Sequence, residues 1–547
     1  MTQFFSFVLR SSIAVLLGAV LLWQPLHAQQ PSPAIEWQKA LGGSGNDVAY
    51  SITQTSDGGY IVAGYSYSTD GDVSGHHGAA NHPDFWIVKL TSGGEIEWQK
   101  SLGGSDGDWA NSITQTRDGG YIVAGYSNST NGDVSGNHGG LDYWIVKLTS
   151  GGEIEWQKSL GGSGDDWASS ITQTSDGGYI VAGRSNSTDG DVSGHHGAAN
   201  HPDFWIVKLT SGGEIEWQKS LGGSNYDDAR SITQTSDGGY IVAGSSGSTD
   251  GDVSGNHGGG DSWIVKLTSG GEIEWEKSLG GSNYDDARSI TQTSDGGYIV
   301  AGVSTSNDGD VSGNYGLFDY WIVKLTSGGG IEWQKSLGGN RDDLASSITQ
   351  TRDGGYIVAG SSRSTDGDVT GHHGSIDSTD SWIVKLTSGG GIEWEKSLGG
   401  SGLDLASSIT QTSDGGYIVA GQSTSTDGDV IGNHGGGDFW IVKLTPPNPT
   451  GVKPTGLPTP SPWAMNANYP NPFSTTTTIT FTVPERSFVR LSVDTEQGVE
   501  VARLIEEQLE AGEYRVPFSG DGLASGTYLY RLSSGSTSLV GKMTIVR

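Results

Sequence analysis

Short apolar segments alternate with clusters of Gly, Asp, Ser and Asn along most of the chain. Four segments recur in a fixed order and read IEWQKSL, SITQT, YIVAG and WIVKL, or close variants of these. Their β-branched and aromatic residues, bounded by turn-forming residues, predict four short β-strands. SDGG or RDGG follows SITQT, and TSGGE or TSGGG follows WIVKL. Connections of this kind predict tight hairpins.

The four-strand unit occurs seven times, with 58 or 61 residues between successive copies. The IEW segment begins at Ile35, Ile96, Ile154, Ile215, Ile273, Ile331 and Ile392. Repeats of four antiparallel strands predict an all-β fold, a seven-bladed β-propeller over residues 35–445. SITQT is then the strand nearest the axis, and IEWQKSL is the outermost.

The phase of the repeats predicts how the ring closes. The chain opens with a spare IEW strand at residues 35–41, and the last unit ends at residues 440–444 without one. The first strand is therefore expected to complete the seventh blade and to leave no open sheet edge. Trp recurs at two strand positions per unit, as at Trp37 and Trp86, which predicts ring contacts between blades.

Composition narrows the range of partners. The 547 residues include 90 Gly, 18 Trp and no Cys, and the formal charge is −32. Such an acidic balance argues against binding nucleic acid or anionic membrane surfaces and favours cations or neutral ligands. Residues 1–28 have the order of a secretory signal peptide, namely Arg10, an apolar core and LHA ending at Ala28. The apolar core is too short for a membrane span, so we expect no transmembrane span in the mature chain.

A second domain follows the propeller. Residues 446–462 hold 7 of the 16 Pro residues and predict an extended linker. Residues 463–547 contain strand-like segments such as TTTTITFTV, FVRLSV and TYLYRL. Because no helical period is sustained there, they predict a small immunoglobulin-like β-sandwich.

This second domain resembles a known family. NYPNPFSTTTTITFTVP, VRLSV, an EQG turn, VARL, AGEYRV, LASGTYLYRL and the final GKMTIVR are similar to the C-terminal (type A) sorting domain of the bacterial type IX secretion system. The resemblance implies recognition of residues 463–547 by the type IX machinery and a secreted or outer-surface location. The chain departs from the family where Asp494, Thr495 and Glu496 replace a Tyr-Asp pair, and where PFSGDG replaces Trp-Asp-Gly. A related domain of flagellar hook proteins shares the same blocks. The propeller units resemble uncharacterised bacterial propellers with DGGYIVAG repeats, which implies a fold and no activity.

The loop between the second and third strands carries a repeated acidic motif, as in STDGDVSGNHG at residues 248–258. With Asp250 as position 1, oxygen-bearing side chains occupy positions 3, 5 and 12, and Gly occupies position 6, as in a twelve-residue calcium loop. The predicted calcium ligands are Asp250, Asp252, Ser254, Asp261, Asp308, Asp310, Ser312, Asp319, Asp133 and Asp142. Asp and Ser also form ordinary turns, so a solvated loop is the alternative interpretation.

Three classes of function are compatible with this pattern. The first is a secreted or surface-displayed binding or adhesion propeller for a glycan or protein ligand, with calcium dependence as an added hypothesis. The second is a structural surface-layer component, and the third is a secreted hydrolase acting on polysaccharide or peptide. The sequence identifies no catalytic or cofactor-binding residue. Trp109 and Trp167 fall in a predicted loop of two blades only and are candidates for an exposed stacking surface. An unequal pocket among the blades would favour binding or catalysis over a structural role.

Overall fold

The computed structural model describes residues 32–446, except 199 and 376, and residues 463–546 with short gaps at 469, 475, 485–486, 496, 510–511, 521–522 and 536. The predicted signal peptide and nearly all of the predicted linker lie outside the described residues. The described residues are all-β, so they contain no helix that is long and apolar enough to cross a membrane.

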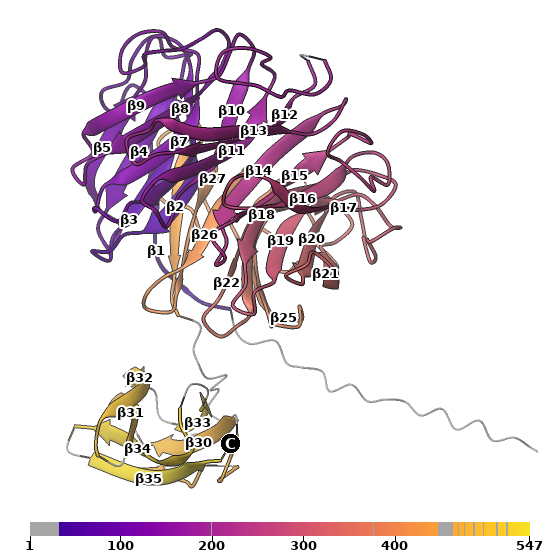
Figure 1. The fold of residues 1–547 in the computed structure, drawn as a ribbon. Helices are drawn as coiled ribbons and strands as arrows, with labels where there is room; N and C mark the ends of the chain where they lie inside the picture. The colour runs from indigo at the N-terminus through magenta and orange to yellow at the C-terminus, as the bar shows by residue number, and fades with distance from the viewer. Residues whose placement is uncertain are drawn as a thin grey trace, which may run out of the picture.

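Seven four-stranded antiparallel sheets form the blades of a propeller, which confirms the predicted fold (Figure 1). The inner strands are β2 (Asp47–Gln54), β6 (Asp108–Gln115), β10 (Asp166–Gln173), β14 (Asp227–Gln234), β18 (Asp285–Gln292), β22 (Asp343–Gln350) and β26 (Asp404–Gln411). The second strands are β3 (Tyr60–Ser66), β7 (Tyr121–Ser127), β11 (Tyr179–Ser185), β15 (Tyr240–Ser246), β19 (Tyr298–Ser304), β23 (Tyr356–Ser362) and β27 (Tyr417–Ser423).

The outer half of each blade has the same regularity. The third strands are β4 (Asp84–Leu90), β8 (Asp142–Leu148), β12 (Asp203–Leu209), β16 (Asp261–Leu267), β20 (Asp319–Leu325), β24 (Asp380–Leu386) and β28 (Asp438–Leu444). The outermost strands are β5 (Ile96–Leu102), β9 (Ile154–Leu160), β13 (Ile215–Leu221), β17 (Ile273–Leu279), β21 (Ile331–Leu337), β25 (Ile392–Leu398) and β1 (Ile35–Leu41).

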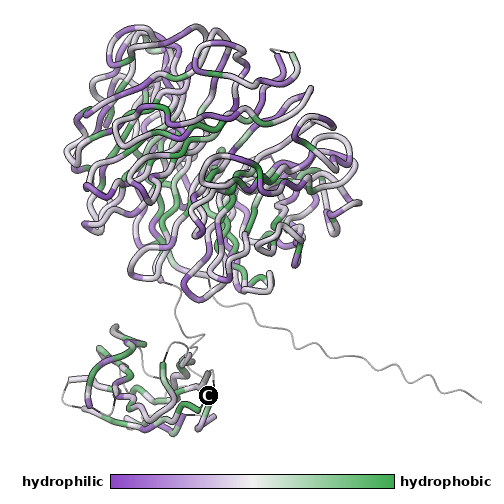
Figure 2. The backbone as a smooth tube through the Cα atoms, viewed as in Figure 1, coloured by the Kyte–Doolittle hydropathy of each residue, from purple (hydrophilic) through white to green (hydrophobic). Residues whose placement is uncertain are grey.

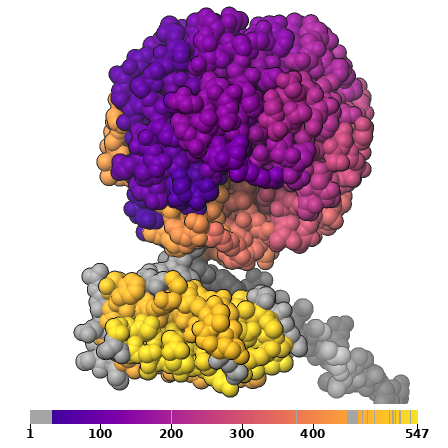
Figure 3. All heavy atoms as spheres, turned by 60° about the vertical axis from the view of Figure 1, so that its left-hand side comes forward, coloured from indigo at the N-terminus to yellow at the C-terminus, as the bar shows by residue number. Residues whose placement is uncertain are grey.

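The seventh blade is completed by the N-terminal strand, as the phase of the repeats predicts. β1 pairs antiparallel with β28, in the register Lys39↔Ile441 and Leu41↔Phe439. The first and last blades also pack side by side, because Trp86 and Phe439 bring their ring centroids within 4.4 Å. In Figures 1 and 3 the orange end of the propeller accordingly lies beside its indigo beginning.

Each hydrophobic core lies between two adjacent blades. In one such core, Ile206 of β12 packs with Val242 of β15 and Trp263 of β16, and all three side chains are fully buried. Phe204 contacts Trp263 with 4.7 Å between ring centroids. The recurring Trp residues of the third strands are thus inter-blade core, as predicted. Figure 2 shows the hydrophobic residues inside the blades and the hydrophilic ones along the connecting loops.

Residues 463–546 form two further sheets. One has the order β29-β30-β33 and the other β32-β31-β34-β35. Their strands are β29 (Ala464–Met465), β30 (Thr476–Val483), β31 (Ser487–Thr495), β32 (Glu500–Leu509), β33 (Gly512–Ser519), β34 (Gly526–Ser534) and β35 (Thr537–Ile545). Residues from both sheets share one core, in which Phe481 and Tyr514 stack at 5.3 Å. This is the predicted β-sandwich.

Candidate functional site

A β-bulge occurs at the same place in every inner strand. In β2 the pairing with β3 jumps from Ala49 to Ser51, so the fourth residue of the strand, Tyr50, has no partner in the ladder. The same jump occurs in the other six blades. A bulge turns the extra side chain away from the regular pleat. The seven bulge residues are Tyr50, Asn111, Ser169, Arg230, Arg288, Ser346 and Ser407.

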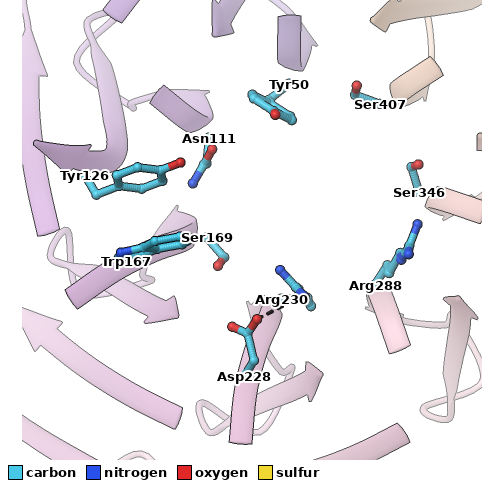
Figure 4. Close-up of a pocket in the computed structure, with 10 residues that line it drawn as sticks. All are labelled: Tyr50, Asn111, Tyr126, Trp167, Ser169, Asp228, Arg230, Arg288, Ser346 and Ser407. Carbon is cyan, nitrogen blue, oxygen red and sulfur yellow. Dashed lines mark ion pairs between the residues drawn. The ribbon is translucent and has the colours of Figure 1, made fainter. Parts of the chain in front are cut away.

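The bulge residues surround a pocket on the propeller axis. Its volume is about 380 Å³, and every blade contributes to its lining (Figure 4). Besides the seven bulge residues it is lined by Tyr126, Trp167 and Asp228. We call these ten residues the axial pocket. It lies about halfway along the inner strands, because each bulge is the fourth of the eight residues of its strand.

Within the inner and second strands, the blades differ at only three positions. Across the inner and second strands, the fifteen positions of the pattern DxAxSITQ and YIVAGxS vary only at x. The second position of the inner strand supplies Trp167 and Asp228, the fourth supplies the bulge residues, and the sixth position of the second strand supplies Tyr126. The pocket is therefore chemically unequal around a nearly uniform frame.

One side of the axial pocket is aromatic. Tyr126 stacks between Trp109, at 5.1 Å, and Trp167, at 4.9 Å. The guanidinium of Arg184 lies over the ring of Trp167, 3.8 Å from the ring centroid. Tyr50 packs against Tyr65 at 5.8 Å and is 39% exposed. Burial raises the pKa of Tyr126 and Tyr50, so both hydroxyl groups stay protonated at neutral pH.

The opposite side is charged. Arg230 donates to Asp228 at 2.9 Å, the ion pair drawn in Figure 4. Its Nε lies 3.9 Å from Asp286, which also pairs with Arg288 at 3.2 Å. Burial lowers the pKa of Arg230, but the two carboxylates outweigh it and raise that pKa overall. The guanidinium is therefore charged at any physiological pH.

The Trp prediction needs a correction. Trp109 and Trp167 do not lie in a loop, because they are the second residues of β6 and β10 and are only partly exposed. Propagation of the strand up to Asp108 and Asp166 places their rings in the stack on Tyr126 rather than in solvent. Both rings therefore stack on Tyr126, and Trp167 is the one that lines the axial pocket.

Sequence reasoning missed the bulge residues. They lie beside the SITQT segment that identifies the inner strand, so the variable residue before it was not singled out. An alignment of the seven units would have found the signal, since this position changes from Tyr to Asn, Ser or Arg while its neighbours stay constant.

The predicted calcium ligands each have partners of their own. Asp250 accepts a hydrogen bond from the backbone N–H of Ser224 at 2.7 Å, and Asp252 accepts one from Gly222 at 3.2 Å. Asp261 is fully buried and accepts from the backbone N–H and Nδ1 of His257. The equivalent carboxylates have equivalent partners, as found for Asp308, Asp310, Asp319, Asp133 and Asp142.

The two serines contact the outermost strand instead. Ser254 donates to Glu276, and Ser312 accepts from Gln334. No group of three or more His, Asp or Glu side chains within the described ranges is arranged to hold a metal ion. One buried side-chain oxygen each of Asp142, Asp261 and Asp319 accepts no hydrogen bond from the part of the chain that the structure describes, and calcium binding stays a prediction.

Comparisons with known proteins identify the second domain. Residues 467–546 match the family model of the secretion system C-terminal sorting domain. The predicted sorting domain is thus confirmed, and the chain is a secreted, cell-surface protein of the type IX route. Interaction with the type IX machinery follows from this domain.

The propeller has more distant likenesses. The regulatory protein FlaEY of Caulobacter vibrioides is 28% identical over 182 residues, which cover 31% of this chain and 19% of FlaEY. PorZ of Porphyromonas gingivalis, described as a surface component of the type IX secretion system, is 12% identical over 93% of this chain and 61% of its own, with a TM-score of 0.38. A member of the DUF4221 family from Bacteroides vulgatus is 9% identical over 61% of this chain and 92% of its own, with a TM-score of 0.33. None of these likenesses transfers a ligand or an activity.

Proposed function

We propose that this protein is a ligand-binding propeller of the cell surface and that its ligand binds in the axial pocket. The observation that supports this is that all ten residues of the pocket lining occupy the three positions at which the inner and second strands vary between blades. The bulge residues take no part in the strand ladders, so strand pairing does not require their variation among Tyr, Asn, Ser and Arg.

The lining suits a small polar ligand. Few polar groups that converge on an otherwise enclosed surface are typical of specific binding sites. Here hydroxyl, amide and charged groups share with three aromatic side chains the lining of a volume of about 380 Å³. Tyr50 and Arg230 are each 39% exposed, so both side chains are accessible to a ligand.

A glycan array with the full-length secreted protein tests this function. The variant makes the bulges uniform by Tyr50→Ser, Asn111→Ser, Arg230→Ser and Arg288→Ser. The control is Arg117→Gln, on a hairpin turn at the other end of the blades, where Arg117 donates to the carbonyl oxygen of Ser175. We expect ligands that bind the wild type and the control but not the uniform variant. Equal binding by all three proteins would place the ligand elsewhere, and a wild type that binds nothing would favour the surface-layer role.

The export step has its own test. Removal of residues 463–547 should leave the propeller in the periplasm of its native host, and a passenger fused to these residues should reach the surface. Normal export of the truncated chain would contradict the role of this domain. Hydrolysis of an array ligand on incubation, rather than its retention, would favour the secreted hydrolase.

A further inference from the structure

Charges alternate along one side of the axial pocket. Arg184 pairs with Asp228 at 3.3 Å, and Asp228 also pairs with Arg230 at 2.9 Å. Arg230 faces Asp286 at 3.9 Å, and Asp286 pairs with Arg288 at 3.2 Å. The side chains of both aspartates are 1% exposed. The row thus contains three guanidinium groups and two buried carboxylates, an excess of one positive charge in a protein whose overall charge is −32.

The row ends on a cation. After the Asp-x-Arg pattern of β14 and β18, β22 carries Leu344 and Ser346 at the corresponding positions. Asp286 is the one ion-pair partner of Arg288 among the described residues. The Arg288 side chain is 31% exposed, and its guanidinium points toward Ser346 in Figure 4. If the alternation of guanidinium and carboxylate groups continued, the next group would be an anion between Arg288 and Ser346.

The rest of the lining is neutral. Ser346, Ser407 and Ser169 offer hydroxyl groups, and Tyr50 offers an aromatic surface across the pocket from Arg288 (Figure 4). A guanidinium forms paired hydrogen bonds with a carboxylate. Hydroxyl groups in the lining can form hydrogen bonds with the hydroxyl groups of a sugar ring, and an aromatic surface can pack against the C–H groups on its face.

We propose that the axial pocket binds an acidic sugar of a glycan, with its carboxylate between Arg288 and Ser346 and its ring toward Tyr50. This proposal rests on the function proposed above and specifies its ligand. A single carboxylate balances the single excess charge, whereas a phosphate monoester carries about −1.5 to −2 at neutral pH.

Titration calorimetry with the full-length protein tests the proposal. The probes are short oligouronates and their methyl esters, which have the same length and no charge. We expect the acids to bind about 10- to 100-fold more tightly than the esters, since a hydrogen bond to a charged group has a net worth in that range. Arg288→Gln should lower the affinity for the acids to that for the esters, and Arg117→Gln should bind as the wild type. The preference should also weaken as salt concentration rises.

Other outcomes separate this proposal from the proposed function. If Arg288→Gln keeps the preference while the uniform variant loses all binding, the ligand site stands and the carboxylate position is wrong. Tighter binding of sulfated glycans, or of peptides through a free C-terminal carboxylate, would overturn the acidic sugar as ligand. Binding of an oligouronate that survives in the uniform variant would remove the axial pocket from both proposals.

Discussion

The two ends of each blade differ in how much they vary. At the hairpin end, a buried Lys of the third strand pairs with an Asp of one hairpin and a Glu of the outermost strand, as Lys266 does with Asp237 at 3.0 Å and Glu274 at 2.7 Å. The seven lysines with these partners are Lys89, Lys147, Lys208, Lys266, Lys324, Lys385 and Lys443. Toward the loop end, halfway along the inner strands, the bulge residues of the same blades are Tyr, Asn, Ser or Arg.

The difference shows how one strand serves two purposes. The Lys, Asp and Glu residues of the hairpin end are held in ion pairs, so a change to one of them costs stability. A bulge residue has no ladder partner, and the packed middle of the blade separates it from the hairpins. Its side chain can therefore change without shifting the register. Four predictions test this separation.

The largest effect should come from deleting β1, Ile35–Leu41. The deletion removes the ladder to β28, the hydrogen bond from Trp440 to Gln38 and the buried side chain of Leu41. At about 1 kcal/mol for each hydrogen bond, the loss is on the order of 5 kcal/mol or more. Thermal unfolding followed by circular dichroism should show a much lower and broader transition. A melt as high and as cooperative as that of the parent would show that β1 does not close the ring.

The second-largest effect should come from pH, because the carboxyl groups at the loop end and at the hairpin end of the blades have pKa values shifted in opposite directions. At the loop end, burial raises the pKa to about 7 for Asp108 and Asp319 and to about 6 for Asp166 and Asp227. The folded protein then binds protons that the unfolded chain, with pKa values near 3.9, releases. Stability should therefore rise as the pH falls from about 8 to about 4, by at most about 1.4 kcal/mol for each unit by which burial raises the pKa of one carboxyl group.

At the hairpin end the sign is opposite. For Asp57, hydrogen bonds from neighbouring Thr and Lys side chains outweigh burial and lower the pKa to about 2. Its contribution is present above about pH 4 and is lost as the pH falls toward 2. The melting temperature should thus peak near pH 4 to 5, and Asp108→Asn should flatten the slope above that peak. A melting temperature that rises steadily up to pH 8 would contradict the buried, protonated carboxyl groups.

A smaller effect on the free energy of unfolding should come from single substitutions at two positions of one blade. Lys89→Met should cost about 1–3 kcal/mol, because Lys89 is 2% exposed and donates to the carbonyl of Leu90 and to Glu97. Tyr50→Ser, at the other end of the same blade, should cost about 1 kcal/mol or less. Urea unfolding measures both. Equal losses would mean that the two ends are coupled.

Calcium should have the smallest effect on stability. The loop carboxylates already accept backbone hydrogen bonds, so we expect a chelator to lower the melting temperature only slightly. If loops such as Asp250 to Asp261 do bind calcium, saturation at 100 times the dissociation constant would add about 2.7 kcal/mol per site. A calcium-specific heat in calorimetry, reduced by Asp252→Ala with Asp310→Ala and not reproduced by magnesium, would support the calcium loops.

The fold was readable from the sequence because its determinants are local and repeated. Strand segments, Gly-containing hairpins and the spare strand at residues 35–41 define the blades and their closure. The axial pocket was not readable, since two non-local facts create it. The bulge turns Tyr50 toward the axis, and closure brings Ser407 of the last blade into the same pocket as Tyr50 of the first. Trp167 was misplaced because the extension of the strand to Asp166 depends on its pairing with Ser185.

Closure by β1 also sets an order of events during folding. Gln38 and Trp440 are 402 residues apart in the chain, yet they are hydrogen-bonded partners. Contacts so distant in sequence form late, because the intervening chain must first be ordered or must lose much of its conformational freedom. The first strand of the propeller to be synthesised therefore waits, unpaired, for the last strand of the ring. The propeller has an exposed strand at each end until that pairing occurs, and only then does it become a closed body.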